Sequence, residues 1–275
     1  MDPDPHPDPH PDDDEVPLTG GGRTVVSRRG DVVLRPATPW SAAVLALLRH
    51  LADRGVAGAP RPVGTGFAAD GREALEFVAG EVLAPAPWSE EAVGGVGVVL
   101  RDLHEAVAGF VPPAGARWQP WFVRGLGRGP RIVGHGDTGP WNWVSRGGRP
   151  VALVDWEAAG PVDPLVELAQ AGWLNAQLVG DVVAQRQGLG TPRERARQLR
   201  LLLDGYALPL ARREELVDLL VEVAVADAAA QADEAHVRPG STDPEPLWAM
   251  AWRTDSARWI LRHRALLVRE ALRPW

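Results

Sequence analysis

Two short apolar runs flank a polar loop near the middle of an otherwise helical sequence, and this segment constrains the fold most. The runs cover residues 131–133 and 151–154, and each is long enough for one buried strand. Between them lies the sequence HGDTGPWN at residues 135–142, and Asp155 directly follows the second run. Because a buried strand fixes the place of an acid at its end, the segment predicts a polar site formed by this loop and Asp155.

The residue types of this segment suit phosphoryl transfer. A carboxylate such as Asp137 can receive or orient the proton of an acceptor hydroxyl, and the oxygens of Asn142 and Asp155 can hold Mg²⁺, which neutralises a triphosphate. The spacing from Asp137 to Asn142, across a loop that contains glycine, allows both to serve one site. The alternative is a polar turn and a strand-end acid in an inert domain.

Composition removes several competing classes of protein. The chain of 275 residues has no cysteine, and its 29 cationic residues are all arginine. Without cysteine there are no disulfides, iron–sulfur clusters, thiolate zinc sites or cysteine nucleophiles. Without lysine there is no Schiff-base chemistry and no Walker-A lysine.

Charge is distributed unevenly along the chain. Seven of the 36 acids fall in residues 1–15, and the remaining 29 balance the 29 arginines, so we do not expect a bulk nucleic-acid binder. The Asp-Pro and His-Pro repeats of residues 1–15 predict a disordered tail. This tail lacks the basic start and apolar run of an export signal, and no apolar stretch approaches the ~18 residues of a membrane span. We therefore expect a cytoplasmic protein that does not enter membranes.

Apolar spacing divides the rest of the chain into two lobes. Residues 16–80 are predicted to be β-rich in the order β-β-β-α-β-β, with Thr38 capping a helix over residues 39–53. From residue 81 to 275 the apolar positions follow helical spacing, apart from the central segment described above. The expected architecture is α+β, with a small N-terminal lobe and a larger helical C-terminal lobe.

The central segment resembles two linked motifs of the aminoglycoside phosphotransferase family, the small-molecule kinases of the protein-kinase-like fold. The HGDxxxxN motif is matched at His135, Gly136, Asp137 and Asn142, and the (I/V)D(W/F)E motif at Val154, Asp155, Trp156 and Glu157. Residues 160–164 and 167–169 resemble the G-D-P and D-L-A stretches that follow. The resemblance covers roughly residues 16–175.

This resemblance implies a two-lobed protein-kinase-like fold and a kinase that moves the γ-phosphate of ATP or GTP to a hydroxyl of a small molecule. The acceptor could be aminoglycoside-like, an amino alcohol or a sugar, because the fold does not select among them. Asp137 would be the catalytic base and His135 would orient the loop. Asn142 and Asp155 would bind Mg²⁺.

The N-terminal lobe departs from the pattern of the family. Gly20, Gly21 and Gly22 would form the turn over the phosphates, and Arg35 stands where the strand lysine is expected. The helix over residues 39–53 has no glutamate, so the usual ion pair is missing or rebuilt. Arg35 could instead be a surface residue of an edge strand, and the glycines could be the end of the tail.

Further residues are candidates for the purine site and for the acceptor pocket. The backbone of Glu76 and Val78 would meet the purine of the nucleotide, whereas Arg72 and Glu73 are expected on the surface and His104 is expected to be structural. The acceptor pocket would draw on residues near the catalytic loop or on an acidic helix. These candidates are Trp118, Trp121, Trp141, Trp143, Asp227, Asp233 and Glu234.

Two rival functions stay open at this point. A pseudokinase, a nucleotide-binding scaffold or sensor without phosphotransfer, is favoured by the missing lysine and helix glutamate and opposed by the presence of Asp137, Asn142 and Asp155. A kinase of protein hydroxyls is opposed by the short segment between Asp155 and Asp163, which leaves no room for a long activation loop.

Overall fold

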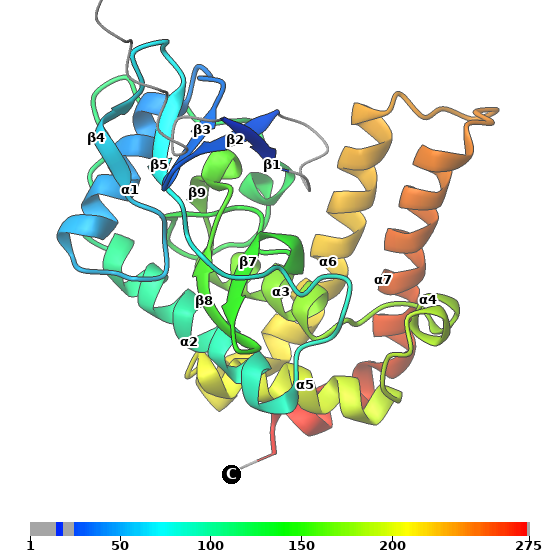
Figure 1. Ribbon diagram of the computed structural model, residues 1–275. Helices are drawn as coiled ribbons and strands as arrows, with labels where there is room; N and C mark the ends of the chain where they lie inside the picture. The colour runs from blue at the N-terminus through cyan, green and yellow to red at the C-terminus, as the bar shows by residue number, and fades with distance from the viewer. Residues whose placement is uncertain (1–14, 19–24, 274–275) are drawn as a thin grey trace, which may run out of the picture.

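The N-terminal lobe is an antiparallel sheet with one helix packed against it (Figure 1). The computed structural model describes residues 15–18 and 25–273. In chain order the lobe contains β1 (Val16–Leu18), β2 (Val26–Arg29), β3 (Val32–Arg35), α1 (Ser41–Asp53), β4 (Pro62–Phe67) and β5 (Glu73–Glu76). This order confirms the predicted arrangement of strands and helix.

The strand order of the sheet decides which residues face the rest of the protein. The sheet runs β1-β2-β3-β5-β4, so β3 is a central strand and pairs with β5 across the connection through α1. Arg35 lies directly opposite Glu73 in this register. The alternative of Arg35 as a surface residue of an edge strand is therefore wrong.

Helix α1 begins two residues later than the sequence suggested. The N-cap position is Trp40, and the backbone N–H of Thr38 donates to the hydroxyl of Ser41, so Thr38 closes a turn before the helix and does not cap it. The apolar stripe is as expected. Val44, Leu47, Leu48 and Leu51 are all buried.

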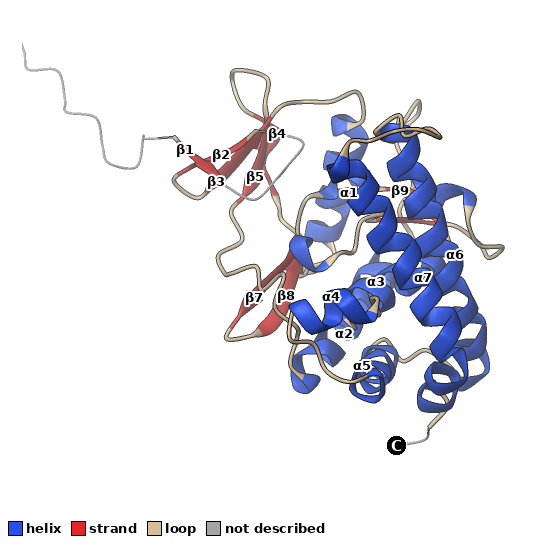
Figure 2. Ribbon diagram, turned by 90° about the vertical axis from the view of Figure 1, so that its right-hand side faces the viewer, coloured by secondary structure: helices blue, strands red, loops and turns tan. Residues whose placement is uncertain are grey.

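The C-terminal lobe is mainly helical and contains two small two-stranded sheets, one of which lies at the edge of the lobe on the side of the N-terminal sheet (Figure 2). Its elements are α2 (Glu90–Val107), the short helix η2 (Phe122–Gly125), β6 (Ile132–Gly134), η3 (Pro140–Asn142), β7 (Trp143–Arg146), β8 (Arg149–Leu153), η4 (Trp156–Ala158), β9 (Gly160–Val162), α3 (Pro164–Asn175), α4 (Asp181–Arg186), α5 (Pro192–Gly205), α6 (Leu210–Glu234) and α7 (Pro244–Ala271). Strand β6 pairs with β9, and β7 pairs with β8. No helix in the described part is long and apolar enough to cross a membrane.

The connection between the lobes is bonded to the C-terminal lobe. Glu81 and Ser145 exchange backbone hydrogen bonds of 3.0 and 2.8 Å, which adds the connection to strand β7. The guanidinium of Arg146 also donates to the carbonyl of Ala79 at 2.8 Å. The chain segment that leaves the N-terminal lobe is therefore held in place by the β7–β8 hairpin.

Helix α2 packs against elements of both lobes. Its sequence explains where it begins and how closely it packs. Ser89 caps its first turn by accepting from the N–H of Ala92. On the side facing α5, Gly97 allows close contact of the two backbones, because a Cβ there would lie 2.0 Å from the carbonyl oxygen of Leu202. A Cβ at Gly94 would meet only the carbonyl oxygen of Leu201, at 3.4 Å.

These two glycines give a matched test of the α2–α5 contact. Gly97→Ala should destabilise the protein by about 1–3 kcal/mol, the cost of overpacking a close contact. Gly94→Ala should be neutral or stabilise by up to about 1 kcal/mol, because alanine is favoured over glycine inside a helix. Urea unfolding of both variants measures the difference, and equal effects would contradict the packing described here.

Candidate active site

The polar loop predicted from the sequence lies between strands β6 and β7 and is bonded to the end of β8. Nε2 of His135 lies 2.9 Å from the carbonyl oxygen of Val154, and the N–H of Asp137 donates to Nδ1 of the same ring at 3.2 Å. Both ring nitrogens are therefore used when the proton is on Nε2. His135 orients the loop in this arrangement and has no free nitrogen to act as a base.

Gly136 is required by the path of this loop. Its φ is +84°, and a Cβ would lie 2.3 Å from the carbonyl oxygen of Ala158. Both facts exclude a larger residue, since an L side chain is strained at this φ and would also clash. The glycine between His135 and Asp137 is thus explained by backbone geometry.

Asp137 and Asn142 are joined across the loop. The side-chain amide of Asn142 donates to the backbone carbonyl of Asp137 at 2.9 Å, and the N–H of Val154 donates to the carbonyl of Asn142 at 2.8 Å. The residue before Asp155 is therefore bonded to both His135 and Asn142. The structure brings the predicted base and the two predicted metal ligands together on one hydrogen-bonded unit.

Trp141 lies directly against the predicted base. Its indole N–H donates to Oδ2 of Asp137 at 3.2 Å, and the side chain is 45% exposed. The ring is folded back over Gly139, where a Cβ would come within 2.2 Å of it. The indole therefore orients the carboxylate and offers a flat face at its side.

The other acceptor candidates have different roles in the structure. Trp143 is buried and donates to the carbonyl of Thr138, and Trp121 donates to the carbonyl of Gly136, so both support the loop. Asp227 is paired with Arg253 at 2.8 Å, which ties α6 to α7. Asp233 and Glu234 lie at the far end of α6, and Trp118 is partly buried against the core.

Three polar residues of α3 hold the loop from behind, and sequence reasoning missed two of them. Glu167 accepts from the N–H of Gly136, and Gln170 accepts from the N–H of Thr138 at 3.0 Å. Asn175 donates to the carbonyl of Thr138 at 2.8 Å. The only signal for Gln170 and Asn175 in the sequence is a polar residue within an otherwise apolar helix, and the loop that each one bonds is known only from the fold.

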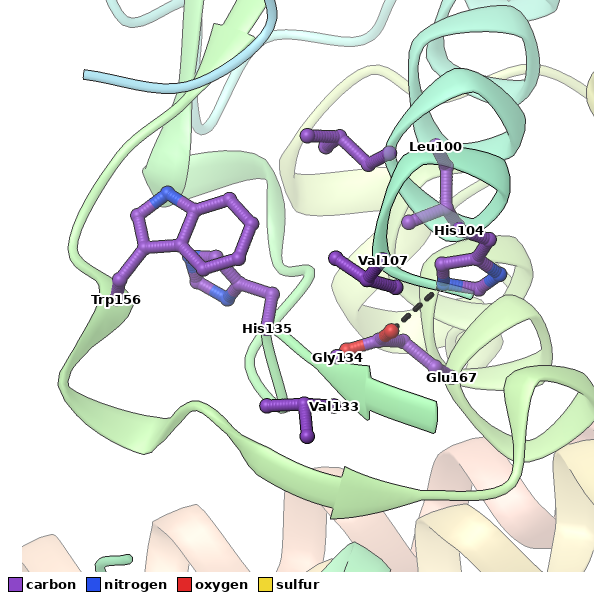
Figure 3. Close-up of a pocket in the computed structure, with 9 residues that line it drawn as sticks. Leu100, His104, Val107, Val133, Gly134, His135, Trp156 and Glu167 are labelled. Atoms are coloured by element: carbon purple, nitrogen blue, oxygen red, sulfur yellow. Dashed lines mark hydrogen bonds and ion pairs between the residues drawn. The ribbon is translucent and has the colours of Figure 1, made fainter. Parts of the chain in front are cut away.

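Glu167 is a fully buried carboxylate whose charge is balanced by hydrogen bonds (Figure 3). Nε2 of His104 lies 2.7 Å from Oε2 of Glu167, and Nδ1 of His104 lies 2.8 Å from the hydroxyl of Tyr206. Burial favours the neutral acid, but His104 and the Gly136 amide outweigh it and lower the pKa of Glu167 below its usual value. The prediction that His104 is structural agrees with these contacts.

A cavity of about 10 Å³ adjoins this pair and is lined by Leu100, His104, Val133, His135 and Trp156 among others. That volume corresponds to about one water molecule. Figure 3 shows His135 and Trp156 on one side of it and the His104–Glu167 pair on the other. The space is too small for a substrate, so it belongs to the support of the loop.

Arg35 projects from the N-terminal lobe into three carboxylates. Its Nε lies 3.5 Å from Glu73, its Nη1 2.8 Å from Asp155 and its Nη2 2.6 Å from Glu157. Burial alone would lower the pKa of Arg35, but the attraction of Asp155, Glu73 and Glu157 raises it above the ordinary value. The expectation that Glu73 lies on the surface is wrong, because its side chain is only 6% exposed.

Glu73 of β5 supplies the acid that pairs with Arg35, which helix α1 does not supply. The acid comes from β5, directly opposite Arg35 on the paired strand, and it is bonded by the side chain of Ser41 at the start of α1. The ion pair between strand and helix is thus rebuilt as an ion pair between two strands, and Ser41 connects it to the helix.

The residues at the end of β8 fit a magnesium ion. Asp155 has left-handed backbone angles of φ 63° and ψ 63°, and its side chain is 53% exposed. The amide nitrogen of Asn142 is used by Asp137, which leaves its oxygen for a ligand. One carboxylate and one amide oxygen, completed by phosphate oxygens and water, form the hard donor set that Mg²⁺ prefers. Within residues 15–18 and 25–273 no three His, Asp or Glu side chains form a metal cage of their own.

The remaining nucleotide-binding predictions concern backbone groups. Gly20, Gly21 and Gly22 lie outside the described residues. Glu76 is the last residue of β5 and its N–H donates to the carbonyl of Arg61 at 2.7 Å, so a purine could meet only its carbonyl. Val78 is half-buried in the connection between the lobes.

Comparisons with known proteins agree with this geometry. A model described as "Phosphotransferase enzyme family" matches residues 116–207. The trifolitoxin immunity protein of Rhizobium leguminosarum bv. trifolii is 58% identical over 254 residues, which cover 92% of this chain and 97% of that protein.

Solved structures of distant kinases share the fold. An amicoumacin kinase, in complex with AMP-PNP, Ca²⁺ and Ami, has a TM-score of 0.64 at 14% identity and covers 90% of this chain and 89% of its own. A microcompartment-associated aminopropanol kinase has a TM-score of 0.60 at 16% identity, with 94% of each chain covered. The predicted two-lobed protein-kinase-like fold is confirmed.

The buried Glu167 makes the support of the loop sensitive to acid. Because the pKa of Glu167 is lowered from 4.5 in the folded protein, its stabilising effect is complete above that pH and is lost as the pH falls further. Glu167→Gln should therefore destabilise by about 1–3 kcal/mol at neutral pH, the cost of an unsatisfied buried hydrogen-bonding group. This difference from wild type should shrink below pH 4.5.

Urea unfolding at neutral and acid pH measures this effect. Glu105→Gln on the exposed side of α2 is the control, since it removes the same kind of charge from a side chain that is 71% exposed. A difference between Glu167→Gln and wild type that does not change with pH would contradict the ionised state of Glu167.

Proposed function

The chain belongs to the phosphotransferase enzyme family, and we propose that it transfers the γ-phosphate of a nucleoside triphosphate to a hydroxyl group of a small molecule. The observation that carries the proposal is the bonded unit of loop and strand. Val154 is bonded to both His135 and Asn142, and this fixes Asp155 relative to Asp137. Phosphoryl transfer depends on positioning and charge stabilisation, so it needs few catalytic groups besides these.

Each residue of the unit has a separate role in this proposal. Asp137 orients the acceptor hydroxyl and takes its proton, and the indole of Trp141 keeps the carboxylate turned toward the acceptor. Asn142 and Asp155 hold Mg²⁺, which neutralises charge on the phosphates when it is bound. Arg35 contacts the phosphates from the N-terminal lobe, where a guanidinium can donate two parallel hydrogen bonds.

The acceptor is proposed from the relative that covers almost the whole chain. The trifolitoxin immunity protein shares 58% identity with it. We infer that the acceptor hydroxyl belongs to a toxin, and that phosphorylation of this hydroxyl protects the cell that makes the protein. Trp141 is the residue placed to contact such a compound, because its exposed face lies beside Asp137.

Replacement of Asp137 tests both the chemistry and the protection. Asp137→Asn should reduce transfer of phosphate from ATP to trifolitoxin by about a hundredfold or more, the usual contribution of a general base. The same variant should no longer protect a toxin-sensitive bacterium in which it is expressed. Asp102→Asn on helix α2 is the control, because this half-exposed acid lies outside the site.

A second candidate function is favoured by one observation. Arg35 is already bonded to Asp155, the predicted charged metal ligand, as expected for a pseudokinase that binds its target without transferring phosphate. In that case Asp137→Asn would still protect the cell, and no phosphate would reach the toxin from wild-type protein. The two candidate functions therefore predict different results when protection of the cell and phosphate transfer to the toxin are measured together.

A further inference from the structure

One guanidinium serves three carboxylates at the boundary of the two lobes. The three nitrogens of Arg35 each contact a different acid, namely Glu73 on β5, Asp155 before η4, and Glu157 within η4. No other arginine of the described residues is paired with these acids. One positive side chain therefore stands against three acidic ones at this point.

The three acids are not equally free to leave Arg35. The side chains of Arg35 and Glu73 are 8% and 6% exposed, so separating them would leave buried charges unpaired. Asp155 is 53% exposed, and its carboxylate can exchange Arg35 for an ion from solution at little desolvation cost. Glu73 is thus the fixed partner of Arg35, and Asp155 is the exchangeable one.

We propose that a divalent cation and Arg35 compete for the carboxylate of Asp155, and that entry of the metal transfers the guanidinium from Asp155 to the phosphates of the nucleotide. The proposal rests on the proposed phosphotransferase function and specifies how its nucleotide site is switched. Nη1 of Arg35 is bonded to Oδ1 of Asp155 at 2.8 Å, so a cation bound by this small carboxylate would lie next to the guanidinium and the two positive charges would repel each other. Glu73 keeps the freed guanidinium between the lobes while this happens.

Competition of this kind is reciprocal. A variant in which residue 35 binds Asp155 more weakly must therefore bind the metal more tightly. Arg35→Lys keeps the charge but replaces three separated nitrogens by one ammonium, which cannot reach Glu73, Asp155 and Glu157 together. Without any nucleotide, this variant should bind Mn²⁺ about tenfold more tightly than wild type. Electron paramagnetic resonance of free Mn²⁺ measures the affinity.

Arg72→Lys is the matched control for this titration. Arg72 is also in the N-terminal lobe and pairs with Glu15 and Asp70, away from the site. Its Mn²⁺ affinity should equal that of wild type. If Arg35→Lys also binds Mn²⁺ as wild type does, the proposed competition is wrong.

A second variant tests the other half of the exchange and leaves the buried pair of Arg35 and Glu73 in place. Asp155→Asn should bind ATP without metal about fivefold more tightly than wild type, because Arg35 is released from a charged partner. Addition of Mg²⁺ should then improve its ATP binding less than it does for wild type. Isothermal titration calorimetry measures both affinities.

Asp102→Asn on α2 is the control, because it removes the same charge from a carboxylate that is also 53% exposed and that Arg35 does not contact. Its metal-free ATP affinity should stay near that of wild type, and an equal gain in both variants would show general repulsion and overturn the exchange. If wild type binds no ATP even with Mg²⁺, the proposed function fails. The Mn²⁺ titration still decides the competition at Asp155 in that case.

Discussion

One buried side chain, that of Arg35, joins the two lobes through its charge. A guanidinium taken out of water is costly unless carboxylates surround it. Arg35 gains one carboxylate from its own lobe, Glu73, and two from the other lobe, Asp155 and Glu157. Ion pairs therefore connect the lobes at the point where a nucleotide is proposed to bind, in addition to the apolar core that α1 shares with α2. The contact that closes the site is also the contact that a nucleotide and its metal would have to rearrange.

The opposite side of the site is built to stay fixed. The loop that carries Asp137 is bonded through Gly136 and Thr138 to the buried side chains of α3, and through His135 to the end of β8. These bonds are shielded from water, so each broken one would leave an unsatisfied polar group. The loop that carries Asp137, the proposed base, is thus held firmly, whereas the half-exposed Asp155 and Arg35 are the groups proposed to change partners. A rigid acceptor side and an exchangeable nucleotide side suit a reaction in which positioning is the main requirement.

The sequence predicted the elements better than it predicted which charged residues are buried. The order of the strands and the helix in the N-terminal lobe follows from local spacing and turn chemistry, and the structure confirms it. Local pattern could not reveal that Glu73 is buried. Its burial depends on the pairing of β5 with β3 across an intervening helix, and no local spacing encodes that register. Gln170 was missed for a related reason, since a polar residue on a buried helix has meaning only once its partner is known.

The presence of arginine instead of lysine at position 35 has a simpler explanation than loss of activity. A strand lysine is absent here, but so is every other lysine, because all 29 cations of the chain are arginine. The substitution therefore follows the composition of the whole protein and by itself says little about whether the site works. What it changes is geometry. A lysine presents one ammonium, whereas the forked arginine has three nitrogens to satisfy, and the structure supplies Glu73 and Glu157 in addition to Asp155. These acids allow an arginine to remain buried at this position, so an arginine in place of lysine is not by itself evidence that the site has lost its activity.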